Sequence, residues 1–240
     1  MKIRGIKDIF SFFTLFPFRG DIVKAANSIY FLPLISLVVG LVSGFIRFYL
    51  NNFAGSLLAS IVAVLSVYLI TGIIHLDGFA DFVDSLFAKG GKEQRLKVLK
   101  DPHVGVASVV SIYFLLTLMT ALTYRIGNNS LVRDILFFTV SDLMGRASII
   151  GSLFGKNYHD GLGKIFAASF KLQYFFYFLI VSLLLLPLIK FFYLSIFIGF
   201  LFGYLFYRLG VELYGASGGD IIGSAVEISR LLGMIIICFI

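Results

Sequence analysis

A run of ten residues, HLDGFADFVD at positions 75–84, places one histidine and three aspartates directly after a strongly apolar segment. Asp81 and Asp84 follow Asp77 by four and seven positions, so on a helix of 3.6 residues per turn all three project from one face. Like charges at this spacing destabilise a helix, and oxygen ligands suit Mg²⁺ or Mn²⁺ rather than zinc. The pattern therefore predicts a divalent metal ion that is held by Asp77, Asp81 and Asp84 and binds a phosphate-bearing substrate; a solvated helix end is the alternative.

His75 and Gly78 lie beside these aspartates, and two roles are open to each of them. His75 lies two positions before Asp77 and points away from the aspartate face of a regular helix. A catalytic role for His75 therefore requires the helix to begin after it or to bend at Gly78, and a packing role is the alternative. Gly78 has no side chain, so either a substrate or a neighbouring helix can approach the chain closely there.

The segment GKNYHDGLGK, at positions 155–164, is a second group of polar residues and is interrupted by glycines. Lys156, His159 and Lys164 are candidate substrate-binding residues, because lysine side chains hold phosphate oxygens as point charges. The alternative is that these are ordinary loop lysines of the kind that accumulate on the cytoplasmic side of membrane proteins.

The segment GASGGD, at positions 215–220, is a glycine cluster that opens the last apolar segment. If a helix starts there, the backbone N–H groups of Gly218 and Gly219 can bind an anion. Asp220 then adds a fourth carboxylate, which is a candidate catalytic group. The cluster does not match the glycine-rich phosphate loop of nucleotide-binding proteins.

The chain that carries these groups is much too apolar for a protein that is soluble in water. Of its 240 residues, 59% are hydrophobic and 14% are charged, whereas soluble domains have roughly 25% charged residues. A bilayer-spanning helix needs about 20 mostly apolar residues. The sequence predicts about seven such spans, at 28–50, 54–74, 104–124, 131–154, 172–188, 191–207 and 221–239. We therefore expect an all-α, polytopic integral membrane helix bundle.

The whole chain, residues 1–240, is expected to form one membrane-embedded domain that contacts lipid. Residues 1–27 are expected to lie at the membrane surface, because Ile3, Ile6, Phe10 and Phe13 recur at helical spacing. The single cysteine, Cys238, excludes an internal disulfide.

Most lysines and arginines fall in the segments before the first span, between the second and third, and between the fourth and fifth. These segments share one side if the spans alternate, and the positive-inside rule makes that side cytoplasmic. All three polar segments described above reach the same side. We therefore expect a multi-pass protein of the cell membrane with its active site facing the cytoplasm. The net charge of +7 reflects this topology, and no nucleic-acid partner is expected.

Two acidic residues, Asp142 and Glu227, fall within predicted spans, where charges are costly and often functional. Arg230 lies three positions after Glu227, so the two side chains can pair on one helix face. Ion pairing and a catalytic role both remain open, and a transport site near the middle of the membrane is a further alternative.

Five motifs, in this order, carry a resemblance to a known family: SFFTLFP, HLDGFADFVD, LKDPHVG, YHDGLGK and GGDIIGSAVEISRL. The chain resembles the cobalamin synthase family, adenosylcobinamide-GDP ribazoletransferase, from residue 11 to about residue 232. The resemblance implies a Mg²⁺-dependent membrane enzyme of late cobalamin biosynthesis. Such an enzyme joins adenosylcobinamide-GDP to α-ribazole, or to its 5′-phosphate, and releases GMP.

The family's reaction suggests roles for individual residues of this chain. A carboxylate within reach would accept the proton of the attacking hydroxyl, and Asp84 is the candidate because it is the last of the three aspartates and the nearest to the following loop. Asp220 would complete the metal shell or orient that hydroxyl. Lys156, Lys164 and Arg146 would stabilise the phosphate charge. The chain departs from the family pattern at four positions, which are Leu15, Ser85, His103 and Gly218.

Two other functions remain as alternatives. A metal-dependent enzyme that transfers CDP-activated groups to alcohols also uses glycine-spaced aspartates, but it needs an Ala-Arg pair where this chain has Ala80 and Asp81. An ion-coupled transporter would use Asp142 and Glu227, and would often show an internal repeat; HLDGFADFVD occurs once. An oligomer is possible, and the sequence leaves its size open.

Overall fold

The computed structural model describes residues 5–127, 130–185 and 192–239, and this part of the chain is almost entirely helical. It contains eleven α-helices and one short 3₁₀ helix, η1. Their bounds are α1 Gly5–Phe13, α2 Ile22–Ala26, η1 Ile29–Phe31, α3 Leu32–Thr71, α4 Ile74–Phe87, α5 Lys92–Leu99, α6 Val106–Arg125, α7 Leu131–Ser152, α8 Leu162–Ser169, α9 Leu172–Leu185, α10 Phe192–Tyr214 and α11 Gly219–Cys238. The all-α expectation is confirmed for these residues.

Helix α3 contains the first two predicted spans and is broken between them at Gly55. This glycine has φ +79° and ψ +160°, a conformation that L side chains rarely adopt. The Ser66 hydroxyl donates a hydrogen bond of 2.8 Å to Ser43 Oγ, although 23 residues separate them. A straight helix would hold these residues roughly 35 Å apart. The two halves of α3 therefore fold back on each other.

Five of the described helices are long and apolar enough to cross a membrane, with α3 taken as one. Helices α8 and α9 are bent by 92° relative to each other and raise the total to six if they form one broken span. The predicted number of seven is not confirmed. The predicted boundary between the fifth and sixth spans falls on residues 186–191, which lie outside the described residues.

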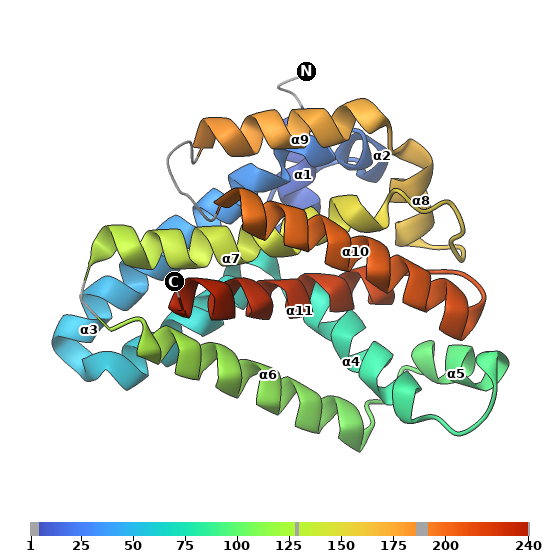
Figure 1. The fold of residues 1–240 in the computed structure, drawn as a ribbon, viewed down its shortest axis with the longest axis horizontal. Helices are drawn as coiled ribbons and strands as arrows, with labels where there is room; N and C mark the ends of the chain where they lie inside the picture. Colours follow the sequence, from blue (N-terminus) through green and yellow to red (C-terminus); the bar gives the residue numbers. More distant parts are fainter. Residues whose placement is uncertain (1–4, 128–129, 186–191, 240) are drawn as a thin grey trace.

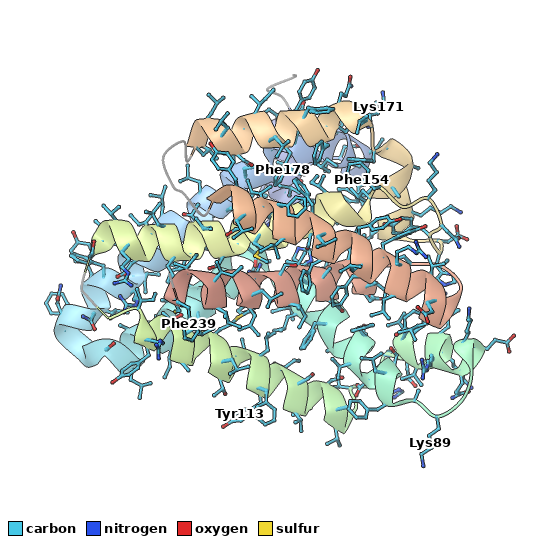
Figure 2. The ribbon with its side chains drawn as sticks, viewed as in Figure 1. Lys89, Tyr113, Phe154, Lys171, Phe178 and Phe239 are labelled. Atoms are coloured by element: carbon cyan, nitrogen blue, oxygen red, sulfur yellow. The ribbon has the colours of Figure 1, made fainter. Side chains whose placement is uncertain are left out.

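The polarity of the protein is inverted relative to a soluble domain. Large apolar side chains are exposed on the outer helices: Phe53 is 85% exposed and Leu184 is 75% exposed. Figure 2 shows Tyr113 pointing outwards from α6, whereas Phe178 lies among the rings between α9 and α10. The largest side chains with almost no exposure include Arg47, Arg146 and Arg230. This distribution suits a surface covered by lipid and a polar interior.

Helix α7 lies at the centre of the bundle, and every residue from Phe137 to Ser152 is buried. Glycines on its neighbours let the backbones approach closely, as in other membrane bundles. A Cβ atom on Gly44 of α3 would lie 2.5 Å from the Ile135 nitrogen, and one on Gly203 of α10 would clash with the Ser148 carbonyl. Helix α7 therefore positions α3, α10 and α11 around itself.

The apolar side of α1 packs against protein. Ile9 and Phe13 are buried, and Ile6 and Phe10 are partly buried against the core. Ile3 lies outside the described residues. The expected amphipathic helix is therefore present, and its most buried residues contact the bundle.

Candidate active site

Helix α4 carries the aspartate-rich motif at one end of the bundle. Gly72, with φ +71°, ends α3 and turns the chain, after which α4 begins at Ile74. Figure 1 shows α4, α5, α8 and the turn between α10 and α11 at this end of the molecule; the end of α6 and the start of α7 lie at the other. The three polar segments of the sequence thus share one end of the bundle.

Glycines bring α4 against the start of α11. A Cβ atom on Gly78 would lie only 2.8 Å from the Asp220 Cα, and one on Gly223 would lie 3.0 Å from the His75 carbonyl oxygen. The Ser224 hydroxyl also donates a hydrogen bond of 3.2 Å to the Gly78 carbonyl. Of the two roles expected for Gly78, the structure shows close approach of a neighbouring helix.

This packing gathers four carboxylates, three of which remain unpaired. We call Asp77, Asp81 and Asp220 the acidic group; in the described part of the chain none of their side chains forms an ion pair or hydrogen bond. Partial burial, followed by the charges of Asp77, Asp220 and Asp84, raises the pKa of Asp81 to about 6. Burial and repulsion both disfavour the charged carboxylate, and a bound cation would offset both effects.

Asp84 has a different environment, because its carboxylate binds the start of α6. Its Oδ2 accepts a hydrogen bond of 2.7 Å from the Gly105 N–H, and its Oδ1 accepts one of 3.0 Å from the Ser108 N–H. The Ser108 hydroxyl also donates to Oδ2. Asp84 thus caps a helix that begins 22 residues later in the chain. Any role for Asp84 as a metal ligand or proton acceptor must compete with these three bonds.

The acidic group fits the way in which magnesium is bound in proteins. Among the described residues, no cluster of three or more His, Cys, Asp or Glu side chains is already positioned to hold a metal ion. Mg²⁺ does not require such a cage, since it usually keeps several waters and binds one or two carboxylates plus substrate phosphates. Asp77 is exposed, and Asp81 and Asp220 are partly exposed, so all three are accessible to solvent.

The second and third polar segments pair with each other beside α4. The His159 N–H donates to the Ser217 carbonyl at 2.9 Å, and the Ser217 N–H donates to the Asn157 carbonyl at 3.0 Å. A Cβ atom on Gly163 would lie 3.1 Å from the Gly219 nitrogen. The segments 155–164 and 215–220 are therefore adjacent, as expected from the sequence.

The start of α11 offers backbone donors near the acidic group. Gly218 is the N-cap residue and no side chain caps the helix. Cβ atoms on Gly218 and Gly219 would meet nothing within 4 Å. The first N–H groups of α11 therefore have no side-chain acceptor among the described residues and could bind an anion, next to carboxylates that favour a cation.

The basic residues predicted to contact substrate differ in whether their side chains are free to bind a ligand. Lys156 is exposed, and Lys164 forms an exposed ion pair of 2.6 Å with Asp160. His159 Nε2 lies 3.2 Å from the Tyr214 carbonyl, so this ring ties the loop to the end of α10. Whether these residues contact substrate stays a prediction.

Arg146 is fully buried in α7, where its NH1 group lies 3.2 Å from His75 Nε2. The guanidinium remains protonated, so it donates and the His75 Nε2 accepts. Burial, and then the charge of Arg146, lower the pKa of His75 well below its usual range. His75 is therefore a neutral imidazole that carries its proton on Nδ1, and its Nε2 is engaged by Arg146 of α7.

The acids within the spans form a closed ion-pair cluster with the arginines of α7 and α11. Asp142 accepts hydrogen bonds from Arg146 at 3.1 Å, from Arg230 at 2.8 Å and from Ser36 at 2.8 Å. Glu227 accepts from Arg230 at 2.6 Å and from Tyr68 at 2.8 Å. The pairing interpretation of Glu227 and Arg230 is confirmed.

Lys100 lies near the candidate site, but no spacing pattern in the sequence marks it as a functional residue. It ends α5 and interacts electrostatically with Asp220 and with Asp160. Its charge therefore acts on both the acidic group and the 155–164 loop. Its only signal in the sequence is its position within the motif LKDPHVG.

Comparisons with known proteins agree along nearly the whole chain. The model of the cobalamin-5-phosphate synthase family matches residues 5–238. The adenosylcobinamide-GDP ribazoletransferase of Pyrococcus abyssi is 30% identical over 239 residues, which cover 98% of this chain and 97% of the relative. The protein of the same name from Clostridioides difficile is 29% identical over 223 residues, which cover 88% and 86%. No solved structure matches the chain.

The family match includes both halves of the site, the aspartates of α4 and the start of α11. The relatives align over most of their own length as well as over most of this chain. The chain therefore belongs to the cobalamin-5-phosphate synthase family.

Proposed function

We propose that this protein is a membrane transferase that joins adenosylcobinamide-GDP to α-ribazole, or to its 5′-phosphate, and releases GMP. Family membership and the names of the relatives support this late step of cobalamin synthesis. The single structural observation that carries it is the acidic group, three unpaired carboxylates beside the open N-terminus of α11. A transferase of this class must bind a pyrophosphate, which is strongly anionic, at such a place.

In this proposal Asp77 and Asp81 would hold Mg²⁺, with Mn²⁺ as a substitute. When bound, the metal supplies charge neutralisation of the pyrophosphate oxygens and stabilises the leaving GMP. The N–H groups at Gly219 and Asp220 would donate to a phosphate oxygen at the same place. Lys100, Lys156 and Lys164 would attract the substrate to this end of the bundle.

The reaction exchanges a phosphoanhydride bond for a phosphate ester. The 3′-hydroxyl of the ribazole attacks the phosphorus attached to cobinamide, a new P–O bond forms, and the P–O bond to GMP breaks. The hydroxyl proton passes to a carboxylate within reach. We assign this role to Asp220 in preference to Asp84, because both Asp84 oxygens already accept hydrogen bonds from α6.

The site is proposed to face the cytoplasm from a multi-pass protein of the cell membrane. The basic segments 89–100 and 155–171 lie at the same end of the bundle as the acidic group. The positive-inside rule places such segments on the cytoplasmic side.

The test is turnover by the whole protein in detergent. Protein incubated with adenosylcobinamide-GDP, α-ribazole or its 5′-phosphate, and Mg²⁺ is expected to form GMP and a new corrinoid in equal amounts. A chelator should stop the reaction, and added Mn²⁺ should restore part of it. A folded preparation that forms neither product would end this proposal, and turnover of a CDP-alcohol instead would favour the other transferase class.

Variants then test the metal ligands. Asp77→Asn and Asp81→Asn are expected to lose activity by roughly a hundredfold or more, since a metal-held phosphate contributes several kcal/mol to the transition state. The fold should be retained, because neither side chain pairs with another in the described structure. Glu93→Gln, an exposed residue on α5, is the matched control and should be fully active. Near-normal turnover by Asp81→Asn would refute the metal assignment.

A further inference from the structure

A pocket of about 100 Å³ lies between α1, α4, α8 and α11, next to the acidic group. Phe12 and Phe13 of α1 and Phe166 of α8 form much of its wall. The Phe166 ring centroid lies 5.1 Å from that of Phe12 and 5.6 Å from that of Phe13, in tilted and edge-to-face contacts. None of these three residues belongs to the acidic group or to the phosphate contacts proposed above.

One side of the same pocket is polar. His75, Gly219 and Asp220 also line it, so Asp220 borders both the pocket and the acidic group. The His75 ring packs 5.9 Å from the Phe13 ring, and the Arg146 guanidinium lies 5.6 Å from the centre of that ring. The pocket is thus an aromatic chamber that meets the proposed site of phosphoryl transfer at one edge.

We propose that this pocket holds the aromatic base of the acceptor nucleoside and thereby selects it. This inference rests on the proposed function. A planar heteroaromatic ring would gain edge and face contacts with the three phenyl rings, in addition to the burial of its apolar surface. Its attached ribose would then extend toward Asp220, where the 3′-hydroxyl must reach the phosphate.

Size and polarity favour this occupant over the alternatives. An apolar cavity of about 150 Å³ is known to hold benzene, so a pocket of about 100 Å³ that opens to one side would take one edge of a planar base, and the rest of the base would extend through the opening. A corrin macrocycle is far larger than this space. A lipid chain would place hydrocarbon against the Asp220 carboxylate, which is unfavourable.

Binding can be measured directly, because the chain contains no tryptophan. Ile74 and Leu162 line the rim of the pocket and are 42% and 43% exposed. Ile74→Trp and Leu162→Trp each introduce a single fluorescent reporter there. Titration with α-ribazole should change the emission of at least one reporter and saturate. Phe53→Trp, at the break in α3, is the control and should show only the effect of light absorbed by the base.

Kinetics provides the second measurement. Phe166→Leu and Phe12→Leu keep an apolar wall but remove a ring, so each should raise the KM for α-ribazole roughly tenfold, which corresponds to about 1.4 kcal/mol. The KM for adenosylcobinamide-GDP should change less than twofold. Each variant should also lower the preference for α-ribazole over an acceptor with a different base.

The outcomes separate this inference from the proposed function. A parent protein without turnover would refute the proposed function, whereas saturable quenching at the rim would still show a base site. If the parent protein turns over, but Phe166→Leu and Phe12→Leu change the KM of both substrates equally or of neither, the pocket assignment is overturned. Equal fluorescence changes at Phe53→Trp and at both rim positions would overturn it as well.

Discussion

Asp81, in the candidate site, has a different environment from the buried carboxylates that join the helices of this protein. The buried carboxylates of Asp142 and Glu227 bind arginines, whereas the charges that act on Asp81 within the described part of the chain are those of other carboxylates. Its charged form is therefore unfavourable in the metal-free protein. A residue that lowers stability in this way is typical of a binding site, where strain in the empty state is relieved by the ligand.

The raised pKa of Asp81 predicts a pH-dependent stability. The stabilising contribution of a carboxyl with a raised pKa is present below the unfolded value of about 4 and is lost as the pH rises through about 6. Asp81→Asn, which has no charge to lose, should therefore raise the Tm of the metal-free protein at pH 7.5 by a few degrees. Solvent screening at this partly exposed residue limits the gain to about 1 kcal/mol.

The measurement is thermal unfolding in detergent with a chelator, at pH 7.5 and at pH 4.5. The gain should shrink at the lower pH, where the parent is already protonated. Excess Mg²⁺ should reverse the order at pH 7.5 by stabilising only the parent. An Asp81→Asn protein that is less stable than the parent without metal at pH 7.5 would show that Asp81 is structural.

At the scale of elements, the crossing of α4 and α11 depends on two glycines. Gly78 faces the backbone of Asp220, and Gly223 faces the backbone of His75. The crossing therefore sets the separation between the aspartates of α4 and the fourth carboxylate on α11. Close helix contacts through small residues are the usual means of association in membrane bundles.

Gly78→Ala should separate these helices. Its Cβ would lie 2.8 Å from a backbone atom, which cannot move aside as a side chain can. We expect a loss of stability of about 1–3 kcal/mol from overpacking, and a loss of activity of tenfold or more because Asp220 moves. Gly91→Ala is the control, since a Cβ there meets nothing within 4 Å. Unchanged activity and Tm in Gly78→Ala would contradict the described packing.

The cap on α6 gives a second element-scale prediction. Asp84→Ala removes the acceptor for three hydrogen bonds at the start of α6, and loss of such a cap costs roughly 1–2 kcal/mol. Asp84→Asn keeps one acceptor oxygen and should lose less. If both variants melt like the parent but lack activity, Asp84 is a reacting group and its bonds to α6 are secondary.

At the scale of the whole molecule, the protein encloses its charges and exposes its apolar residues. The cluster of Asp142, Arg146, Glu227 and Arg230 joins α7 to α11, and a separate pair, Arg47 and Asp134, joins α3 to α7 at 2.6 Å. Two acids balance two arginines in the cluster. It is therefore a closed structural unit, which weighs against a transport site at Asp142 and Glu227.

Asp142→Asn should destabilise the bundle strongly. It leaves Arg146 and Arg230 short of one negative charge in a buried position, and breaking such a unit typically costs about 3–5 kcal/mol. Asp160→Asn is the control, because its pair with Lys164 is exposed and should matter by less than about 1 kcal/mol. A Tm for Asp142→Asn equal to that of the control would show that the cluster is not needed for the fold.

The orientation of the molecule is testable with introduced cysteines. In a Cys238→Ser background, Lys92→Cys on α5 should react with a membrane-impermeant reagent only from the cytoplasm, because basic segments stay inside. Phe53→Cys, at the break in α3, should react only from outside. Reaction of both from the same side would remove the basis for a cytoplasmic active site.

The helical class, and the face of α4 that carries three aspartates, could be predicted from the amino-acid sequence alone. Both follow from local properties, namely apolar runs of membrane length and the spacing of residues on a helix. The order of the motifs was enough to indicate the family. The pairing of Glu227 with Arg230 was also predictable, because they lie one helical turn apart.

How these parts meet could be seen only after the helices had been packed together. The hydrogen bonds to Asp84 come from α6, the partner of His75 comes from α7, and the phenyl rings of the pocket come from α1 and α8. No local pattern encodes such contacts, because they depend on how helices cross, and the crossings depend on glycines such as Gly78 that have no chemistry of their own. The separation of a structural Asp84 from an unpaired Asp81, three positions apart on one helix face, therefore became visible only when the helices were packed together.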